Sequence, residues 1–119
     1  MPDIIIASSV APVTHKMLKT LQGKPYEDMI KFVVDIEEEK IAFGGEMHSD
    51  AEYELLQNGS SQQNLWGANY YPLRKTQDRI EYTSLINIRP SIKNLSMEIQ
   101  SEEIKNRINT ILKQCVRDK

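Results

Sequence analysis

Hydrophobic and polar residues alternate along residues 30–36, with an apolar side chain at every second position. A period of two is typical of a β-strand that buries one face. Three consecutive glutamates follow, and a second apolar run then extends over residues 40–48. We therefore expect residues 30–36 and 40–48 to form an antiparallel hairpin that is covered mostly on one side.

Three further stretches have the composition of strands. The β-branched run at residues 4–6 predicts a short first strand. Residues 64–71 and 79–90 are rich in apolar and aromatic residues, and the polar residues 72–78 join them. We expect these two long stretches to form a second hairpin, which ends at Pro90 because proline has no backbone donor.

Helical spacing of apolar residues predicts two helices near the ends of the chain. The first follows Pro12 and stops at Gly23 and Pro25, which are residue types that end helices. The second starts near Ser101. Its apolar residues lie on one side of the helix, and they are Ile104, Ile108, Ile111, Leu112, Cys115 and Val116.

A third helix is predicted between the two hairpins. Ser49 with Glu52 three positions later has the pattern of a capping box, and the helix should end near Gln57. The predicted order is therefore β-α-β-β-α-β-β-α. Short links between neighbouring strands favour an α+β fold with a mainly antiparallel sheet and the helices packed on one face.

Length and charge limit the class of protein. The 119 residues correspond to a single globular domain, residues 1–119. With 15 basic and 17 acidic residues, the charge balance does not favour nucleic acid as a partner. There is no signal peptide or membrane-spanning run, so we expect no membrane association. The lone Cys115 fits a reducing compartment, and we expect a cytoplasmic protein.

The residues Glu46 and His48 are the first candidates for chemistry. They follow two glycines and would point to the same side of an extended strand. Zinc or manganese would require a third protein ligand, and helix capping already accounts for the nearby Asp50. No metal site is therefore assigned. No cofactor can be named either, because the chain has neither a P-loop nor a dinucleotide fingerprint.

A second polar set interrupts the later strands. Asn64, Asn69 and Asn87 are poor strand formers, and Arg89 would share one face with Asn87. Arginine could hold a phosphate or carboxylate there. It could equally form an internal ion pair with Glu46, and the sequence does not decide between these two possibilities.

The chain resembles a small family of bacterial proteins that carry a domain of unknown function. The resemblance extends from about Phe32 to the last helix. It is based on Val34-Asp35, Gly44-Gly45-Glu46-x-His48, Asn64-Leu65-Trp66-Gly67 and Ile86-Asn87-Ile88-Arg89-Pro90, and the position of Asn94 also matches. It implies a small cytosolic protein and no established activity.

Three functions remain open at this point. The first is a binding module for a small anionic ligand, a nucleotide or a protein partner, with Asn64, Asn69, Asn87 and Asn94 as binding residues. The second is a small hydrolase or ribonuclease, in which His48 is the general base, Glu46 orients it and Arg89 stabilises negative charge. The third is a structural homodimer without a small-molecule site.

Overall fold

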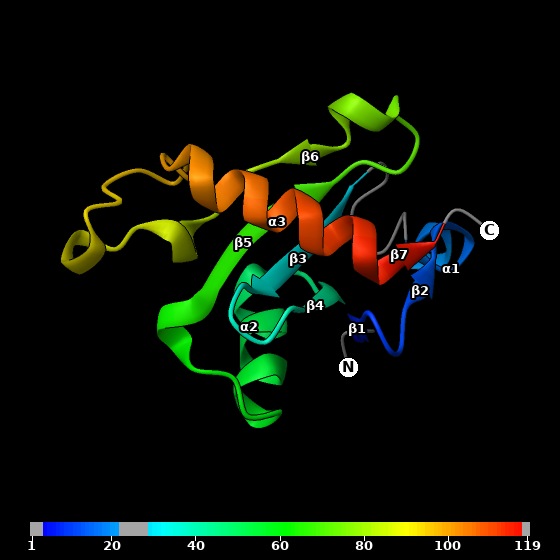
Figure 1. The fold of residues 1–119 in the computed structure, drawn as a ribbon, viewed down its shortest axis with the longest axis horizontal. Helices are drawn as coiled ribbons and strands as arrows, with labels where there is room; N and C mark the ends of the chain where they lie inside the picture. Colours follow the sequence, from blue (N-terminus) through cyan, green and yellow to red (C-terminus); the bar gives the residue numbers. More distant parts are fainter. Residues whose placement is uncertain (1–3, 22–28, 118–119) are drawn as a thin grey trace.

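Five strands form one antiparallel sheet in the order β1-β4-β3-β5-β6 in the computed structural model (Figure 1), which describes residues 4–21 and 29–117. The sheet strands are β1 (Ile4–Ser8), β3 (Ile30–Asp35), β4 (Lys40–Gly44), β5 (Leu65–Tyr70) and β6 (Ile80–Glu81). The helices are α1 (His15–Leu21), α2 (His48–Gln57) and α3 (Glu102–Cys115). Four short 3₁₀ turns are η1 (Gln62–Asn64), η2 (Thr76–Asp78), η3 (Leu85–Asn87) and η4 (Pro90–Ile92). The prediction of an α+β fold with a mainly antiparallel sheet is confirmed.

A small second sheet joins the two ends of the described chain. Strand β2 (Val13–Thr14) pairs in parallel with β7 (Val116–Arg117). Val116 was expected to lie on the apolar side of the last helix, but α3 ends one residue earlier at Cys115. None of the helices within the described residues is long and apolar enough to cross a membrane.

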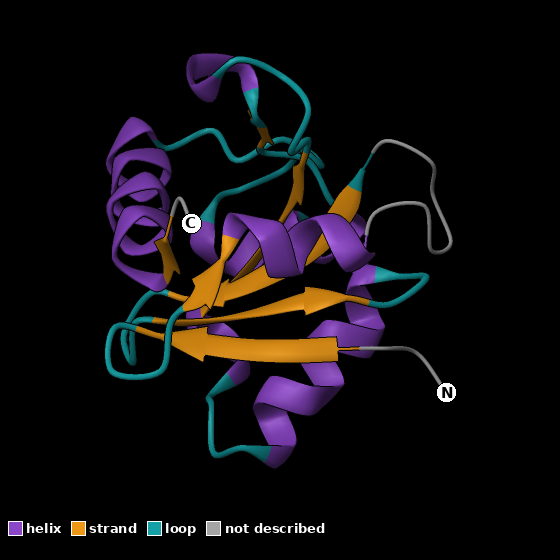
Figure 2. Cartoon of the chain, turned by 90° about the vertical axis from the view of Figure 1, so that its right-hand side faces the viewer, coloured by secondary structure: helices purple, strands orange, loops and turns teal. Residues whose placement is uncertain are grey.

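The helices pack on both faces of the sheet, so the expectation of a single covered face is wrong. Phe32 and Val34 of β3 belong to the main core, which also contains Ile108 and Ile111 of α3. Their neighbour Val33 belongs to a second cluster with residues of α2. Figure 2 shows the sheet between α2 and the other two helices. The second face is covered because it is itself apolar: its buried residues Val33, Ala42 and Leu65 form a cluster with Ala51 and Leu55 of α2.

The first helix begins later than the sequence indicates. It starts at His15 instead of following Pro12, and the Thr14 Oγ1 accepts a hydrogen bond from the Met17 N–H at 3.0 Å. This bond satisfies one of the free donors in the first turn of the helix. The expected stop signals at Gly23 and Pro25 lie outside the described residues.

The predicted strand over residues 79–90 is wrong for most of its length. Only Ile80 and Glu81 pair with β5, and the chain then turns into η3. The hydroxyl of Ser84 accepts a hydrogen bond from the Ile86 N–H at 3.3 Å, and this local bond competes with strand pairing. Glu81 is therefore the last residue of the edge strand.

The side chain of Asn87 takes the place of that missing strand beside Gly67. The Gly67 N–H donates to Asn87 Oδ1 at 2.8 Å, and Asn87 Nδ2 donates to the Gly67 carbonyl at 2.9 Å. The same Nδ2 donates to the Met97 carbonyl at 3.0 Å. A Cβ atom on Gly67 would lie 2.7 Å from the Ser84 Cβ, so only glycine allows this close approach.

Replacing Asn87 should therefore destabilise the fold strongly. The change Asn87→Ala leaves the Gly67 N–H, the Gly67 carbonyl and the Met97 carbonyl without this partner. We expect a loss of roughly 3 kcal/mol in the free energy of unfolding, measured by urea denaturation. The control is Asn64→Ala, because the Asn64 side chain is partly exposed and makes no hydrogen bond in the described structure. Its effect should stay within about 0.5 kcal/mol, and equal losses in both variants would contradict the assignment.

Candidate functional site

A glycine turn places His48 under the sheet. Strand β4 ends at Gly44, and Gly44 and Gly45 have φ angles of 112° and 90°, which favour glycine. The expected strand over residues 40–48 is therefore too long, and Glu46 and His48 do not alternate along a strand. A Cβ atom on Gly45 would lie 2.9 Å from the Cβ of Asp50, so the turn packs closely on the first turn of α2.

The cap of α2 also differs from the predicted one. The helix begins at His48, and the Met47 N–H donates to Asp50 Oδ2 at 3.0 Å. The predicted capping box of Ser49 and Glu52 is wrong because the helix starts before Ser49, which is thus already inside it. This earlier start gives His48 a fixed position in the first helical turn, directly after the glycine turn.

His48 is a buried and neutral histidine. The residue is only 7% exposed, and its Nε2 donates a hydrogen bond to the Ala68 carbonyl at 2.7 Å. Burial lowers the pKa of His48 to about 4; the hydrogen bond to Ala68 opposes this shift, and the charge of Lys31 adds to it. Because Nε2 carries the proton, Nδ1 keeps its lone pair and is a hydrogen-bond acceptor.

Asn69 presents a second acceptor beside His48. Its Nδ2 donates to Glu81 Oε1 at 2.8 Å, and the Tyr71 hydroxyl donates to the same Glu81 oxygen at 3.1 Å. These bonds orient the amide, so that its oxygen points away from Glu81. Asn69 Oδ1 is buried and accepts no hydrogen bond of good geometry, although it lies near enough to His48 to favour the charged imidazole slightly. A buried acceptor of this kind needs an explanation.

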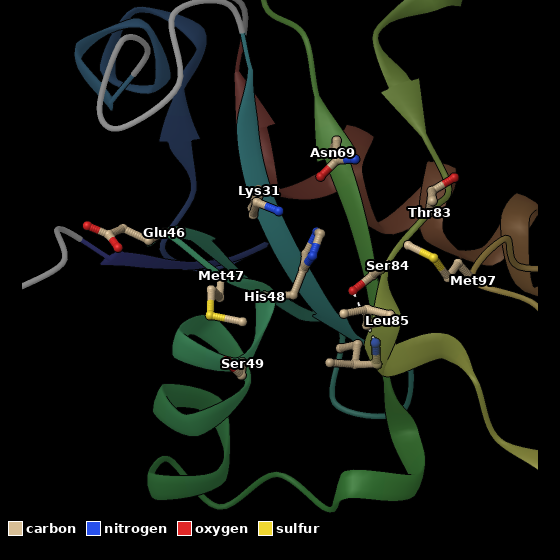
Figure 3. Close-up of a pocket in the computed structure, with 11 residues that line it drawn as sticks. Lys31, Glu46, Met47, His48, Ser49, Asn69, Thr83, Ser84, Leu85 and Met97 are labelled. Carbon is tan, nitrogen blue, oxygen red and sulfur yellow. Dashed lines mark hydrogen bonds between the residues drawn. The ribbon is translucent and has the colours of Figure 1, made fainter.

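These two residues line a cleft of about 360 Å³ between α2 and η3, which we call the His48 cleft (Figure 3). Its volume lies in the range of small-molecule sites. The polar side chains that line it are Lys31, Glu46, His48, Ser49, Asn69, Thr83 and Ser84. Its apolar walls are formed by Met47, Leu85, Ile86 and Met97.

Of the residues that were predicted to act together with His48, Glu46 lines the same cleft and Arg89 does not. Glu46 is exposed, and its carboxylate points away from the imidazole (Figure 3). Arg89 lines a different cleft on the other side of η3 and forms no ion pair with Glu46 among the described contacts. The three residues proposed for general-base chemistry are therefore not brought to one place.

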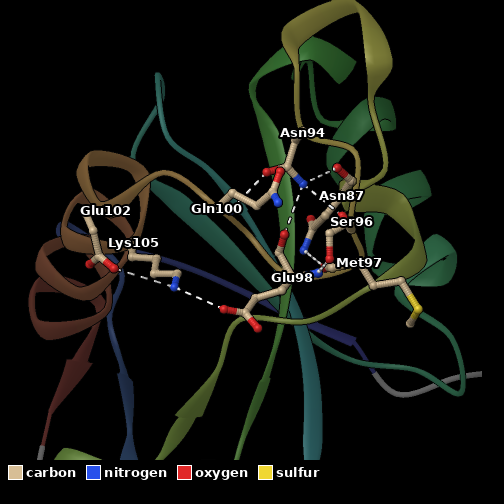
Figure 4. A network of polar contacts seen from close by, with 8 residues as sticks. All are labelled: Asn87, Asn94, Ser96, Met97, Glu98, Gln100, Glu102 and Lys105. Carbon is tan, nitrogen blue, oxygen red and sulfur yellow. Dashed lines mark hydrogen bonds and ion pairs between the residues drawn. The ribbon is translucent and has the colours of Figure 1, made fainter.

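The remaining predicted asparagines do not line the His48 cleft. Asn87 holds Gly67, as described above, and Asn64 closes the short turn η1. Asn94 is buried, and its Nδ2 donates to the carbonyls of Asn87, Ser96 and Glu98 at 2.8–3.1 Å. Figure 4 shows that this network holds the loop between η3 and α3.

Sequence reasoning missed Lys31, Thr83 and Ser84 as parts of the site. Lys31 is the residue of β3 between Ile30 and Phe32, and it lies on the face that also carries Asn69 of β5. The signal for Lys31 was its cationic side chain on the second face of the strand. This position indicates a site only once it is known that β5 pairs with β3 and places Asn69 beside Lys31. Thr83 and Ser84 were hidden by the predicted strand over residues 79–90.

Within residues 4–21 and 29–117, no three histidine, cysteine, aspartate or glutamate side chains come together as ligands for a metal ion. The His48 cleft is lined by one cation, Lys31, and one carboxylate, Glu46, beside the side chains of His48 and Asn69.

A family model described as a protein of unknown function (DUF5674) matches residues 4–115. The chain belongs to this family. The match begins earlier than the resemblance near Phe32 and includes the five-stranded sheet and the three described helices, while β7 lies beyond it. No curated protein and no solved structure matches the chain.

The low pKa of His48 predicts how stability depends on pH. In the folded protein the imidazole titrates near pH 4, whereas in the unfolded chain it titrates near 6.5. As the pH falls from 6.5 to 4, protons bind the unfolded state first, so stability decreases by up to roughly 3 kcal/mol. The variant His48→Gln should lose this part of the slope, measured by urea denaturation at several pH values.

The matched control for this experiment is His15→Gln, which removes the other histidine of the chain. It should keep the slope that belongs to His48. If the free energy of unfolding has the same pH dependence between pH 4 and 6.5 in His48→Gln and in the wild type, the conclusion that His48 is buried as a neutral imidazole is wrong.

Proposed function

We propose that the protein is a binding module for a small anionic ligand that carries N–H donor groups, and that the His48 cleft is its site. The main support is Asn69 Oδ1, a buried acceptor without a hydrogen bond at the floor of this cleft. A ligand N–H group would satisfy this atom. Leaving such an atom unpaired costs about 1–3 kcal/mol, and this cost would be relieved on binding.

The other groups of the cleft define the class of ligand. The neutral His48 offers a second acceptor through Nδ1, so a ligand with two adjacent N–H donors could bind both residues. Lys31 lines the cleft and its positive charge acts on His48, so it would attract an anionic group placed beside it. Met47 and Met97 provide adaptable apolar walls for a flat ring. Nucleotides combine these features, because they have donor edges, a planar ring and a phosphate.

This geometry favours binding over hydrolysis. A histidine whose pKa is about 4 is a weak base at neutral pH. Glu46 does not point toward the imidazole, and Arg89 lies in the other cleft. The hydrolase hypothesis would thus need a different orienting group and a different oxyanion stabiliser.

The setting of this module is also a proposal. The buried thiol of Cys115 has a pKa raised by desolvation to about 11, so it is unreactive and fits a bacterial cytoplasm. Homodimer formation stays an alternative role. It would make the melting temperature depend on protein concentration.

Binding should depend on Asn69. We expect at least one of the nucleoside monophosphates AMP, GMP, CMP and UMP to raise the melting temperature of the wild type. The variant Asn69→Ala should bind the same nucleotide about tenfold more weakly in calorimetric titrations, as expected for about 1.4 kcal/mol. Asn64→Ala is the matched control and should bind like the wild type.

Two further arms test the chemistry of the ligand. Lys31→Ala should weaken binding of the nucleotide but not of its nucleoside, because the nucleoside has no phosphate. Inorganic phosphate alone should not reproduce the shift. If none of the nucleotides binds, or if Asn69→Ala binds as well as Asn64→Ala, the proposed site is wrong.

A further inference from the structure

A second cleft of about 420 Å³ lies on the other side of η3 and contains Arg89; we call it the Arg89 cleft. Leu85 and Ile86 line both clefts, so η3 forms the wall between them. The function proposed for the His48 cleft makes no use of this space. Its charged residues are Arg89 and Glu52 of α2.

The guanidinium of Arg89 is held in a fixed orientation. Nε donates to the Ile86 carbonyl at 3.1 Å, and Nη1 donates to the Gln63 carbonyl at 3.3 Å. The guanidinium also lies over the Trp66 ring at 5.2 Å from its centre. Nη2 is buried and makes no hydrogen bond to any residue that the structure describes. Arg89 therefore has an oriented donor for which the described part of the chain supplies no acceptor.

Glu52 introduces the opposite charge without neutralising Arg89. Both residues line the cleft, but the described contacts include no ion pair between them. Burial lowers the pKa of Arg89, and the carboxylate of Glu52 opposes this shift, which shows that the two charges are near each other. Arginine stays charged in proteins despite such a shift. Two unpaired charges of opposite sign in one cleft are complementary to a zwitterion.

The rest of the cleft wall is aliphatic and open to solvent. Leu85, Ile88 and Ile92 also line it, and they are 65%, 43% and 46% exposed. Exposed apolar residues that cluster beside oriented charged groups indicate a binding surface. This wall could cover a branched aliphatic side chain of a ligand.

We propose that the Arg89 cleft binds a free α-amino acid with an aliphatic side chain. The carboxylate accepts hydrogen bonds from the guanidinium of Arg89, the ammonium donates to the carboxylate of Glu52, and the side chain packs on Leu85, Ile88 and Ile92. In α-amino acids the two charged groups are joined through one carbon atom, so a single small molecule can bridge two opposite charges that do not touch.

The test uses L-leucine and two analogues that each lack one charged group. 4-Methylpentanoate has no ammonium, and 3-methylbutylamine has no carboxylate. We expect saturable binding of L-leucine to the full-length wild type, seen as NMR chemical-shift changes in the amides of residues 85–92. Each analogue should bind at least tenfold more weakly than L-leucine, as expected when a hydrogen bond to a charged group is lost.

The decisive variant is Glu52→Gln, a conservative change on a helix surface that should leave the fold intact. It should weaken L-leucine about tenfold and should not weaken 4-methylpentanoate, because that analogue has no ammonium. Glu54→Gln is the matched control, since Glu54 is an exposed glutamate of the same helix and does not line the cleft. It should bind both compounds like the wild type.

Arg89→Lys provides the complementary arm. It keeps the positive charge but loses the planar fork of donors, so it should weaken both L-leucine and 4-methylpentanoate. Its circular dichroism spectrum reports whether the loop around η3 remains folded. Asn69→Ala should bind L-leucine normally, which separates this site from the His48 cleft.

Two outcomes would overturn the proposal. One is the lack of saturable L-leucine binding to the wild type at millimolar concentration. The other is equal binding of L-leucine by Glu52→Gln and Glu54→Gln, because the ammonium would then have no specific partner in the cleft.

Discussion

The paired hydrogen bonds between the Asn87 amide and the peptide groups of Gly67 determine the shape of the second half of the molecule. They satisfy part of the outer edge of β5 with a side chain instead of a strand. The chain is therefore free to leave the sheet after Glu81 and to form η3. Both clefts depend on this departure, because η3 is the wall that they share. The network of Asn94 then fixes the loop that returns to α3.

Each cleft is lined by a residue with a buried polar atom that has no hydrogen-bond partner within residues 4–21 and 29–117. Asn69 Oδ1 is an acceptor and Arg89 Nη2 is a donor, and each belongs to a side chain whose orientation other hydrogen bonds determine. Most buried polar groups in proteins have partners, so these two atoms indicate a local cost in stability. Each cleft is lined by one cation and one carboxylate, which are Lys31 and Glu46 in the His48 cleft and Arg89 and Glu52 in the Arg89 cleft.

The sequence predicted the central hairpin, β5 and α3 because their apolar periods reflect real packing against a core. It failed over residues 79–90, where the alternating pattern is present but Ser84 and Asn87 bind the backbone locally. Gly44 and Gly45 were interpreted as a thinned strand, whereas their positive φ angles make a turn. For the site, His48 and Asn69 were named and do share a cleft. The separate location of Arg89 could not be foreseen, because the sequence places Arg89 in a strand over residues 79–90. In the structure this strand ends at Glu81, and Arg89 lies in the loop that follows.

The small parallel pair of β2 and β7 connects residues that are about as far apart in the chain as the described structure allows. Protein synthesis is vectorial, so Val13 leaves the ribosome long before its partner Val116 exists. Cys115 and Leu112, which pack in the same core as Val13 and Leu18, also arrive last. The amino-terminal elements must therefore wait until residues 112–116 have been synthesised, and until then α1 lacks the residues of α3 that share its core. Closure of the shared core should thus be a late step of folding, with the apolar side of α1 available to chaperones until α3 has formed.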